Sequence, residues 1–222
     1  MCGRYATTRS SADLSRLFEA FDETEGGVTV DYNVAPTDKV PIVRVSASRE
    51  ARVLTVARWG LVPPWATDPR IGSRMINARA ETVASSRAYA QSFERRRCLV
   101  PVDGWYEWTR SPTGKQAFYM NMNGEGLTMG GIWSVKGDLL TFSVITLPAR
   151  GDLAKVHDRM PLLLPPDRWS EWLSATPSDD LLTPADDDYL STIEIRAVGS
   201  AVGDVRNDGP GLIEPIEAGL LF

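Results

Sequence analysis

The second residue of the chain, Cys2, has the chemistry of an aldehyde trap once the initiator methionine is removed. Removal of Met1 requires a small side chain at position 2, and cysteine is small enough. The freed amine, with a pKa of about 8, is about 10% neutral at pH 7, and a lysine amine is roughly 250-fold less so. We therefore expect the amine to form an imine with an aldehyde. The adjacent thiol can then close a five-membered thiazolidine ring on the imine carbon.

Six sequence blocks set this cysteine in a wider pattern. They are MCGRY at 1–5, YNVAPT at 32–37, WGLVPPW at 59–65, NARAET at 77–82, CLVPVDGWYEW at 98–108 and HDRMP at 157–161. In this order and spacing, from residue 2 to about 210, they resemble the SRAP family, the SOS response-associated peptidases regarded as abasic-site processing proteins. The resemblance implies that Cys2 links covalently to the ring-opened sugar aldehyde, and that Asn77, Glu107 and His157 complete the catalytic site.

The environment of Glu107 predicts a carboxyl group with an unusual pKa. Its neighbours in sequence are Trp105, Tyr106 and Trp108, so the carboxylate is expected in an apolar wall. Desolvation there raises the pKa and suits the group to act as a base toward the amine of Cys2. The alternative is an exposed carboxylate that alternates with buried aromatic residues along a strand.

His157 and Asn77 also have chemical interpretations of their own. His157 is the only histidine of the chain, and with an ordinary pKa of about 6.5 it can protonate the departing sugar oxygen. Asn77 offers a donor and acceptors, which suits it to orient the sugar hydroxyl or the nucleophile. The structural alternatives are a histidine without a chemical role and an asparagine that caps a helix before Ala78.

DNA contacts are expected from charged and aromatic residues near these positions. Arg4, Arg79 and Arg159 each lie within two residues of a proposed catalytic position, and their guanidinium forks suit phosphate oxygens. Trp59 and Trp108 are candidates to stack on neighbouring bases, because single-strand binding combines a basic track with aromatic platforms. The predicted partner is single-stranded DNA that contains abasic sites.

Net charge alone is a weak guide to this partner. The formal charge is −5, but residues 1–150 carry 19 basic and 15 acidic side chains, and residues 151–222 carry 5 basic and 14 acidic ones. The first part is therefore at +4 and the second at −9. The first part can carry a basic groove, and the alternative is a mixed, solvated surface.

Two other functions remain open at this point. Cys2 and His157 are also the residue types of a cysteine peptidase, although no oxyanion hole can be recognised in the sequence. A single-strand binding module in which Cys2 is incidental is the second alternative, and under it affinity would not depend on the lesion.

Cysteine and histidine usage predicts neither a metal nor a cofactor. Cys98 opens an apolar stretch and is expected to be an inert buried thiol, and the two cysteines lack CxxC spacing. No apolar run has the roughly 18 residues of a membrane span, and the start lacks a secretory signal. We expect a cytoplasmic monomer, associated with the nucleoid during repair.

The pattern of apolar residues and turns predicts one α+β domain over 1–222, with a largely antiparallel, barrel-like mixed β-sheet flanked by short helices. A helix over 11–21 is expected after a Ser10 or Ser11 cap, broken helix over 78–97, and an acidic, solvated excursion at about 175–190. The proline-rich segment 59–69 predicts a packed functional loop. Further short helices are expected at 151–156 and 167–173, and strands at 40–45, 52–57, 98–102, 105–108, 116–121, 127–135, 139–147, near 162 and at 193–198.

Overall fold

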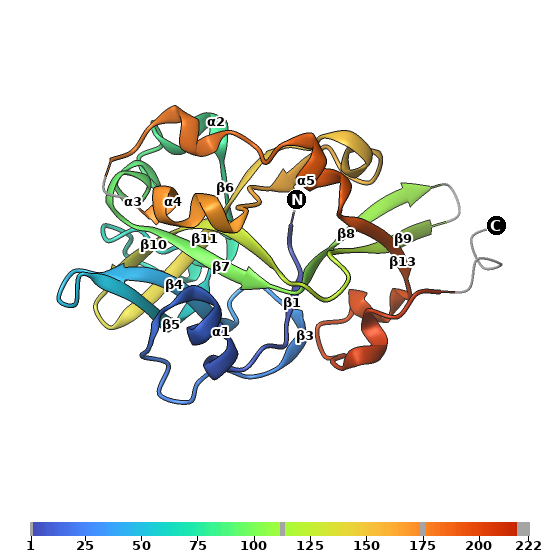
Figure 1. Ribbon diagram of the computed structural model, residues 1–222, viewed down its shortest axis with the longest axis horizontal. Coiled ribbons are helices and arrows are strands. Elements are labelled where there is room, and N and C mark those ends of the chain that lie inside the picture. The colour runs from blue at the N-terminus through green and yellow to red at the C-terminus, as the bar shows by residue number, and fades with distance from the viewer. Residues whose placement is uncertain (1, 112–113, 174–175, 217–222) are drawn as a thin grey trace.

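The computed structural model describes residues 2–111, 114–173 and 176–216, whose strands form two sheets flanked by short helices (Figure 1). The strands are β1 (Tyr5–Thr7), β2 (Phe21–Asp22), β3 (Asp31–Val34), β4 (Lys39–Ser46), β5 (Ala51–Trp59), β6 (Asn77–Arg79), β7 (Arg97–Val102), β8 (Gly104–Ser111), β9 (Gly114–Asn121), β10 (Leu127–Lys136), β11 (Leu139–Pro148), β12 (Arg159–Pro161) and β13 (Glu194–Val198). The α-helices are α1 (Ser11–Phe18), α2 (Ala80–Val83), α3 (Ala90–Arg95), α4 (Trp169–Leu173) and α5 (Asp187–Ser191). The 3-10 helices are η1 (Pro69–Arg74), η2 (Gly151–Lys155), η3 (Pro166–Arg168), η4 (Asp179–Leu182), η5 (Ser200–Gly203) and η6 (Pro210–Leu212).

Strands of the larger sheet close into a barrel. Antiparallel pairs connect β11, β10, β7, β4 and β5 in that order, and β5 then pairs in parallel with β11 through Arg58↔Thr141 and Trp59↔Phe142. Closure leaves no open edge between these strands. The predicted barrel-like, largely antiparallel sheet is therefore confirmed.

The smaller sheet carries the N-terminal strand and joins it to the barrel. Its order is β13, β9, β8, β1, β3, and β1 lies near the centre of the molecule (Figure 1). Successive residues of a strand point to opposite faces. Accordingly Tyr5 and Trp105 belong to the main core, while Ala6 and Tyr106 belong to a smaller core on the other face. Strand β1 therefore lies at the junction between the two cores.

Helix α1 follows β1 and packs on the barrel. Ser10 caps it by accepting a hydrogen bond from the Asp13 backbone N–H at 3.1 Å, as the sequence predicts. The helix buries Leu14 and Phe18, and it ends when Glu19 adopts a left-handed conformation. The predicted end at Phe21 is therefore three residues too late.

Most other predicted elements are found, with two corrections. Helices α2 and α3 lie within the predicted broken helix 78–97, but Asn77–Arg79 is a strand. The described part of the acidic segment, 176–190, contains η4 and α5. Its acidic side chains are solvated, as predicted, but Leu181, Ala185 and Leu190 are buried against the fold.

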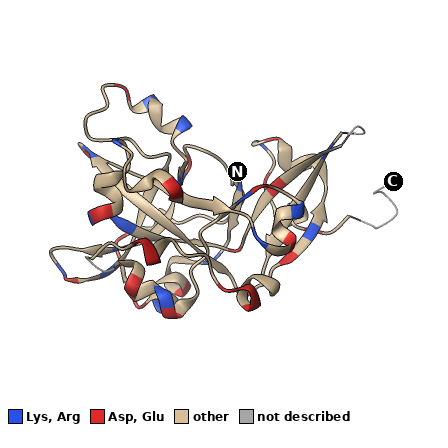
Figure 2. Cartoon of the chain, turned by 90° about the horizontal axis from the view of Figure 1, so that it is seen from above, with Lys and Arg blue, Asp and Glu red and all other residues tan. Residues whose placement is uncertain are grey.

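Basic and acidic residues are interspersed along the chain (Figure 2). Several arginines pair with nearby carboxylates, among them Arg44 and Arg49 with Glu23. The mixed, solvated surface describes the chain better than one broad basic groove. No helix among the described residues has the length and apolar character of a membrane span.

The proline-rich loop after β5 is pinned to the barrel by its backbone. Gly60 N–H donates to the Phe142 carbonyl at 2.8 Å, and Leu61 N–H donates to the Met75 carbonyl at 3.0 Å. Gly60 has φ +119°, and a Cβ there would lie 2.3 Å from the Gly72 carbonyl oxygen. Only glycine fits at this approach, which holds η1 and the segment leading to β6 against the barrel.

Gly60→Ala should destabilise the fold by at least about 2 kcal/mol, because the new methyl group meets a backbone carbonyl and the φ angle is strained. Urea unfolding measures the loss. Gly199→Ala is the matched control, since a Cβ at position 199 has no atom within 4 Å. Equal unfolding midpoints for the two variants would contradict this account of the loop.

Candidate active site

The backbone of Cys2 is held by a side chain from a distant segment. Asn77 Nδ2 donates a hydrogen bond of 2.7 Å to the Cys2 carbonyl oxygen. On the following residues, Tyr106 N–H donates to the Arg4 carbonyl at 3.0 Å, which ties the start of β1 to β8. Cys2 itself is completely buried. These contacts give the first residues of the chain one fixed position.

Burial changes the acidity of the Cys2 thiol. Desolvation raises its pKa well above the ordinary value, and the negative charge of Glu107 raises it further. The thiol is therefore protonated at neutral pH. The Glu107 carboxylate therefore acts on the thiol through its charge.

Glu107 lies on β8, two residues beyond the Trp105↔Tyr5 pair of β8 and β1. It is only 3% exposed, and burial raises its pKa to about 7, with a smaller contribution from Asp158. The direction predicted from its aromatic neighbours is confirmed, and the alternative of an exposed carboxylate is wrong. At neutral pH the group is close to half ionised, which suits both uptake and release of a proton.

Asn77 is placed by strand pairing. It opens β6, which runs parallel to β11 with Asn77 opposite Val144. Tyr89 donates a hydrogen bond of 3.2 Å to the Asn77 carbonyl. The side-chain oxygen Oδ1 is buried and has no hydrogen-bond partner among the described residues. Asn77 does not cap the following helix, because α2 begins at Ala80 with Arg79 at the cap position.

His157 lies in the turn between η2 and β12. Its Nδ1 accepts a hydrogen bond of 3.0 Å from the Arg159 backbone N–H and lies 2.8 Å from Asp158 Oδ1. Partial burial lowers its pKa below the ordinary value, so the imidazole is mostly neutral at pH 7 and above.

The four predicted catalytic residues thus come from four separate segments. A hydrogen bond joins Asn77 to Cys2, and electrostatic interaction joins Glu107 to the Cys2 thiol. The charge of Asp158, the residue next to His157, makes a small contribution to the raised pKa of Glu107. Among the described residues there is no cluster of three His, Cys, Asp or Glu side chains that could hold a metal.

The predicted DNA contacts are less uniform. Trp59 is completely buried, packs on Tyr5 with ring centroids 4.9 Å apart, and donates its Nε1–H to the Ile76 carbonyl at 2.9 Å. The prediction that Trp59 stacks on a base is therefore wrong. Trp59 is the last residue of β5, and the pairing of β5 with β11 directs its ring into the core. Trp108 is half-buried beside the smaller core.

Two of the three predicted arginines are already engaged within the protein. Arg4 Nη1 donates to Asn33 Oδ1 at 2.7 Å and to the Val202 carbonyl at 2.9 Å. Arg159 makes a bidentate pair with Glu81, and its side chain is 11% exposed. Both guanidinium groups therefore already have partners within the protein, and phosphate contacts by them stay a prediction. Arg79 is exposed.

The sequence reasoning missed Trp65, the second tryptophan of the proline-rich loop. It is 49% exposed, and the Arg87 guanidinium lies over its ring at 4.9 Å from the centroid. An exposed aromatic ring beside a cation suits a nucleic acid base. Position in the sequence could have indicated its exposure, because Trp65 follows Pro63 and Pro64 outside any strand, whereas Trp59 is the last residue of a strand.

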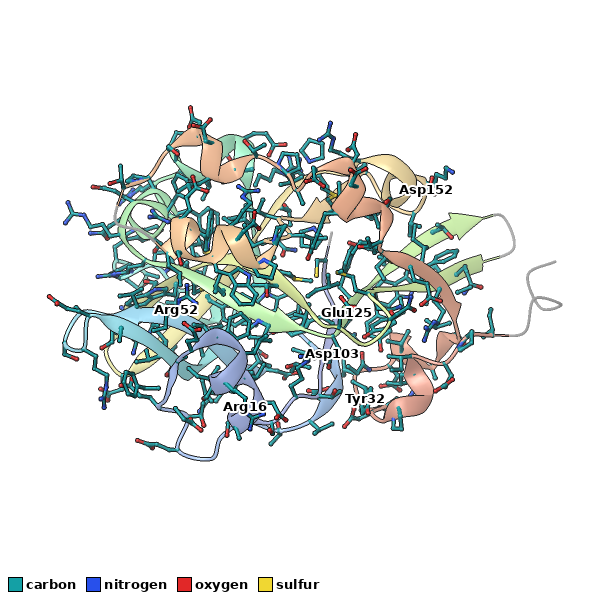
Figure 3. The ribbon with its side chains drawn as sticks, viewed as in Figure 1. Arg16, Tyr32, Arg52, Asp103, Glu125 and Asp152 are labelled. Carbon is teal, nitrogen blue, oxygen red and sulfur yellow. The ribbon has the colours of Figure 1, made fainter. Side chains whose placement is uncertain are left out.

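A groove of about 710 Å³ lies away from these residues, on the opposite face of the smaller sheet. Arg16, Tyr32 and Asp103, which line it, are labelled in Figure 3. None of the four predicted catalytic residues lines it. The candidate site is defined by buried contacts at the sheet junction, so this hollow is not part of it.

The chain belongs to the family described as SOS response associated peptidase (SRAP), whose model matches residues 1–205. It is 33% identical to the abasic site processing protein YoqW of Bacillus subtilis, over 96% of this chain and 99% of that protein. It is 32% identical to YedK of Escherichia coli, over 97% and 100%, and 31% identical to HMCES of Gallus gallus, over 99% and 79%. Both of these relatives also bear the name abasic site processing protein.

Solved structures agree with the fold. A crystal structure of a protein from Bacteroides thetaiotaomicron matches with a TM-score of 0.82 at 20% identity, covering 97% of this chain and all of that one. A protein from Bordetella bronchiseptica matches with a TM-score of 0.74 at 22% identity, covering 89% of this chain. At such identities the likeness concerns the fold.

Replacing Glu107 with glutamine should change how stability depends on pH. The folded pKa of about 7 exceeds the unfolded value of about 4.3, so the stabilisation is present below about 4.3 and is lost as pH rises through 7. Between pH 6 and 9 the native chain should lose about 1.4 kcal/mol that Glu107→Gln retains.

Urea unfolding at the two pH values measures this difference. Glu194→Gln is the control, because Arg196 lowers the pKa of Glu194, so this carboxylate stays ionised in both the folded and the unfolded state between pH 6 and 9 and its replacement should leave the pH dependence in this range unchanged. Parallel stability curves for the native chain and Glu107→Gln would contradict the raised pKa.

Proposed function

We propose that this chain binds single-stranded DNA at abasic sites and captures the ring-opened sugar aldehyde covalently through Cys2. The names of the relatives support the substrate. The observation that carries the proposal is the hydrogen bond from Asn77 to the Cys2 carbonyl, because it fixes the residue that bears both nucleophiles. Fixing a nucleophile in advance lowers the entropic part of the barrier.

The raised pKa of the thiol favours attack by the amine first. A buried, protonated thiol is a poor nucleophile, whereas the Cys2 amine freed by Met1 removal has a neutral fraction. The amine nitrogen bonds to the aldehyde carbon, and the carbonyl oxygen leaves as water, giving an imine. The sulfur then bonds to the same carbon, its proton passes to the imine nitrogen, and a thiazolidine results.

Glu107 is placed to move the protons in these steps. With a pKa of about 7, it can take a proton from the attacking amine and return it to the hydroxyl group that leaves as water. The same group can accept the thiol proton as the ring closes. Its burial beside Cys2 keeps bulk water from competing for these transfers.

His157 and Asn77 act on the sugar and the nucleophile. His157 can donate a hydrogen bond, or its proton, to the sugar oxygen that departs when the deoxyribose ring opens. Asn77 uses Nδ2 to hold Cys2, and its buried Oδ1 remains available to accept a hydrogen bond from the substrate.

The DNA strand is expected to pass over the exposed loop. Trp65 with Arg87 offers a stacking platform, and Arg79 supplies a positive charge at the end of the strand that begins with Asn77. Arg4, Arg159 and Trp108 support the site from within the fold or at its margin.

The raised pKa of Cys2 disfavours the peptidase alternative. Cysteine peptidases depend on a thiolate, which an electropositive environment stabilises. Here burial and the charge of Glu107 act in the opposite direction. A cysteine that supplies an amine as well as a thiol fits these surroundings better.

Purified chain should form a heat-stable crosslink with a single-stranded oligonucleotide in which a glycosylase has converted uracil to an abasic site. Cys2→Ala should abolish the heat-stable crosslink, because the remaining amine can form only a reversible imine and no sulfur is left to close the thiazolidine ring. Cys98→Ala is the matched control, since it removes the other buried thiol. Denaturing electrophoresis gives the yield. Equal crosslinking by Cys2→Ala, or equal affinity for intact and abasic strands without any crosslink, would sink the proposal.

Trp65→Ala should weaken binding to an intact single strand by about 1–3 kcal/mol, because one base loses its aromatic platform. Trp65→Phe should retain most of the affinity. Fluorescence anisotropy at one fixed salt concentration measures both. If Trp65→Ala binds as tightly as the native chain, the strand does not run over this loop.

A further inference from the structure

Two neighbours of the His157 imidazole favour different protonation of the same nitrogen, Nδ1. The Arg159 backbone N–H donates to Nδ1 at 3.0 Å, which requires a lone pair there and places the hydrogen of a neutral ring on Nε2. The Asp158 carboxylate lies 2.8 Å from the same Nδ1, and a hydrogen on Nδ1 would satisfy it. A neutral imidazole satisfies only one of them. The tautomer therefore depends on how firmly each neighbour is held.

Arg159 is held much more firmly than Asp158. Its Nη1 and Nη2 donate to the two carboxylate oxygens of Glu81, and Nη2 also donates to the Thr146 carbonyl at 2.7 Å. The Arg159 side chain is 11% exposed, whereas that of Asp158 is 87% exposed. Bidentate guanidinium–carboxylate pairs are strong and fixed in geometry, and exposed single carboxylates are neither.

The Glu81–Arg159 pair also connects the segment that carries Asn77 with the segment that carries His157. Glu81 lies in α2, directly after the β6 strand that begins with Asn77, and Arg159 begins β12. Both strands pair with β11 at Thr146, opposite Arg79 on one side and Pro161 on the other. The ion pair therefore spans β11 and fixes the segment of His157 relative to the segment of Asn77.

We propose that Glu81 is a positioning residue which, by clamping Arg159 across β11, keeps the hydrogen of neutral His157 on Nε2. Without the clamp the backbone of Arg159 loosens, and the Asp158 carboxylate draws the hydrogen to Nδ1. As far as catalysis is concerned, the inference rests on the proposed function, because an Nε2–H donor is what the sugar oxygen would meet. The tautomer itself is independent of any activity.

The single histidine of the chain makes a direct test possible. Nitrogen-15 NMR of the imidazole at pH 8 reports only His157, and the shifts of its two nitrogens identify which one carries the hydrogen. The native chain should show the Nε2–H form. Glu81→Gln should shift the tautomer ratio about tenfold toward Nδ1–H, the equivalent of losing one charge-assisted hydrogen bond.

A matched variant and a rescue separate positioning from general damage. Glu194→Gln breaks a comparable pair, in which Arg196 donates to both oxygens of Glu194 on the edge strand β13, and it should leave the tautomer unchanged. The double variant Glu81→Gln with Asp158→Ala removes the competing acceptor and should restore Nε2–H. Glu81→Asp keeps the charge with a shorter reach and should lie between Glu81→Gln and the native chain.

Single-turnover crosslinking provides the second readout. Glu81→Gln should react about tenfold more slowly while binding an intact strand with unchanged affinity, and the double variant should recover the native rate. A tautomer that stays Nε2–H in Glu81→Gln, or that shifts equally in Glu194→Gln, would overturn the inference. If the native chain forms no crosslink at all, the proposed function fails, and the tautomer measurement still decides the role of Glu81.

Discussion

The hydrogen bond from the Asn77 side chain to the Cys2 carbonyl is the contact on which the site depends. A residue near the end of a chain gains conformational freedom unless contacts with other segments remove it. Here a side chain from β6 and the pairing of β1 with β8 supply those contacts. The closed barrel matters because it holds β6 at a fixed place beside β11, and through it the amide that reaches Cys2.

One cause, burial, sets the protonation of the proposed reacting groups. Desolvation penalises the charged form of each group, so it raises the pKa of the Cys2 thiol and of Glu107 and lowers that of His157. The neutral forms of the thiol and the imidazole therefore dominate near pH 7, while Glu107 is balanced between its two forms. This distribution suits condensation of an amine with an aldehyde, which needs a proton shuttle more than it needs a thiolate.

Local patterns in the sequence predicted the elements well where chemistry and geometry are local. The Ser10 cap, the strands of the barrel and the raised pKa of Glu107 all follow from neighbouring residues. The closing pair of β5 with β11 and the short strand β6 depend on residues far apart in sequence, so no local pattern reveals them.

The same limit applies to the predicted DNA contacts. An arginine near a catalytic position looks free until its distant partner is known, as with Arg159 and Glu81. Trp59 and Trp65 differ by burial, which their shared loop motif does not reveal. Residue types and motif order identified the candidate site, and pairing across the sheets was needed to separate residues that can face the substrate from those that support the fold.

Mass spectrometry of the N-terminal peptide after capture of an abasic oligonucleotide, with and without borohydride, tests the central claim most directly. The account predicts a peptide that begins at Cys2, carries the sugar with loss of one water, and gains no hydrogen from borohydride, because a thiazolidine has no imine bond left to reduce. An adduct on a lysine, an adduct that borohydride reduces, or a reactive chain that still carries Met1 would contradict it.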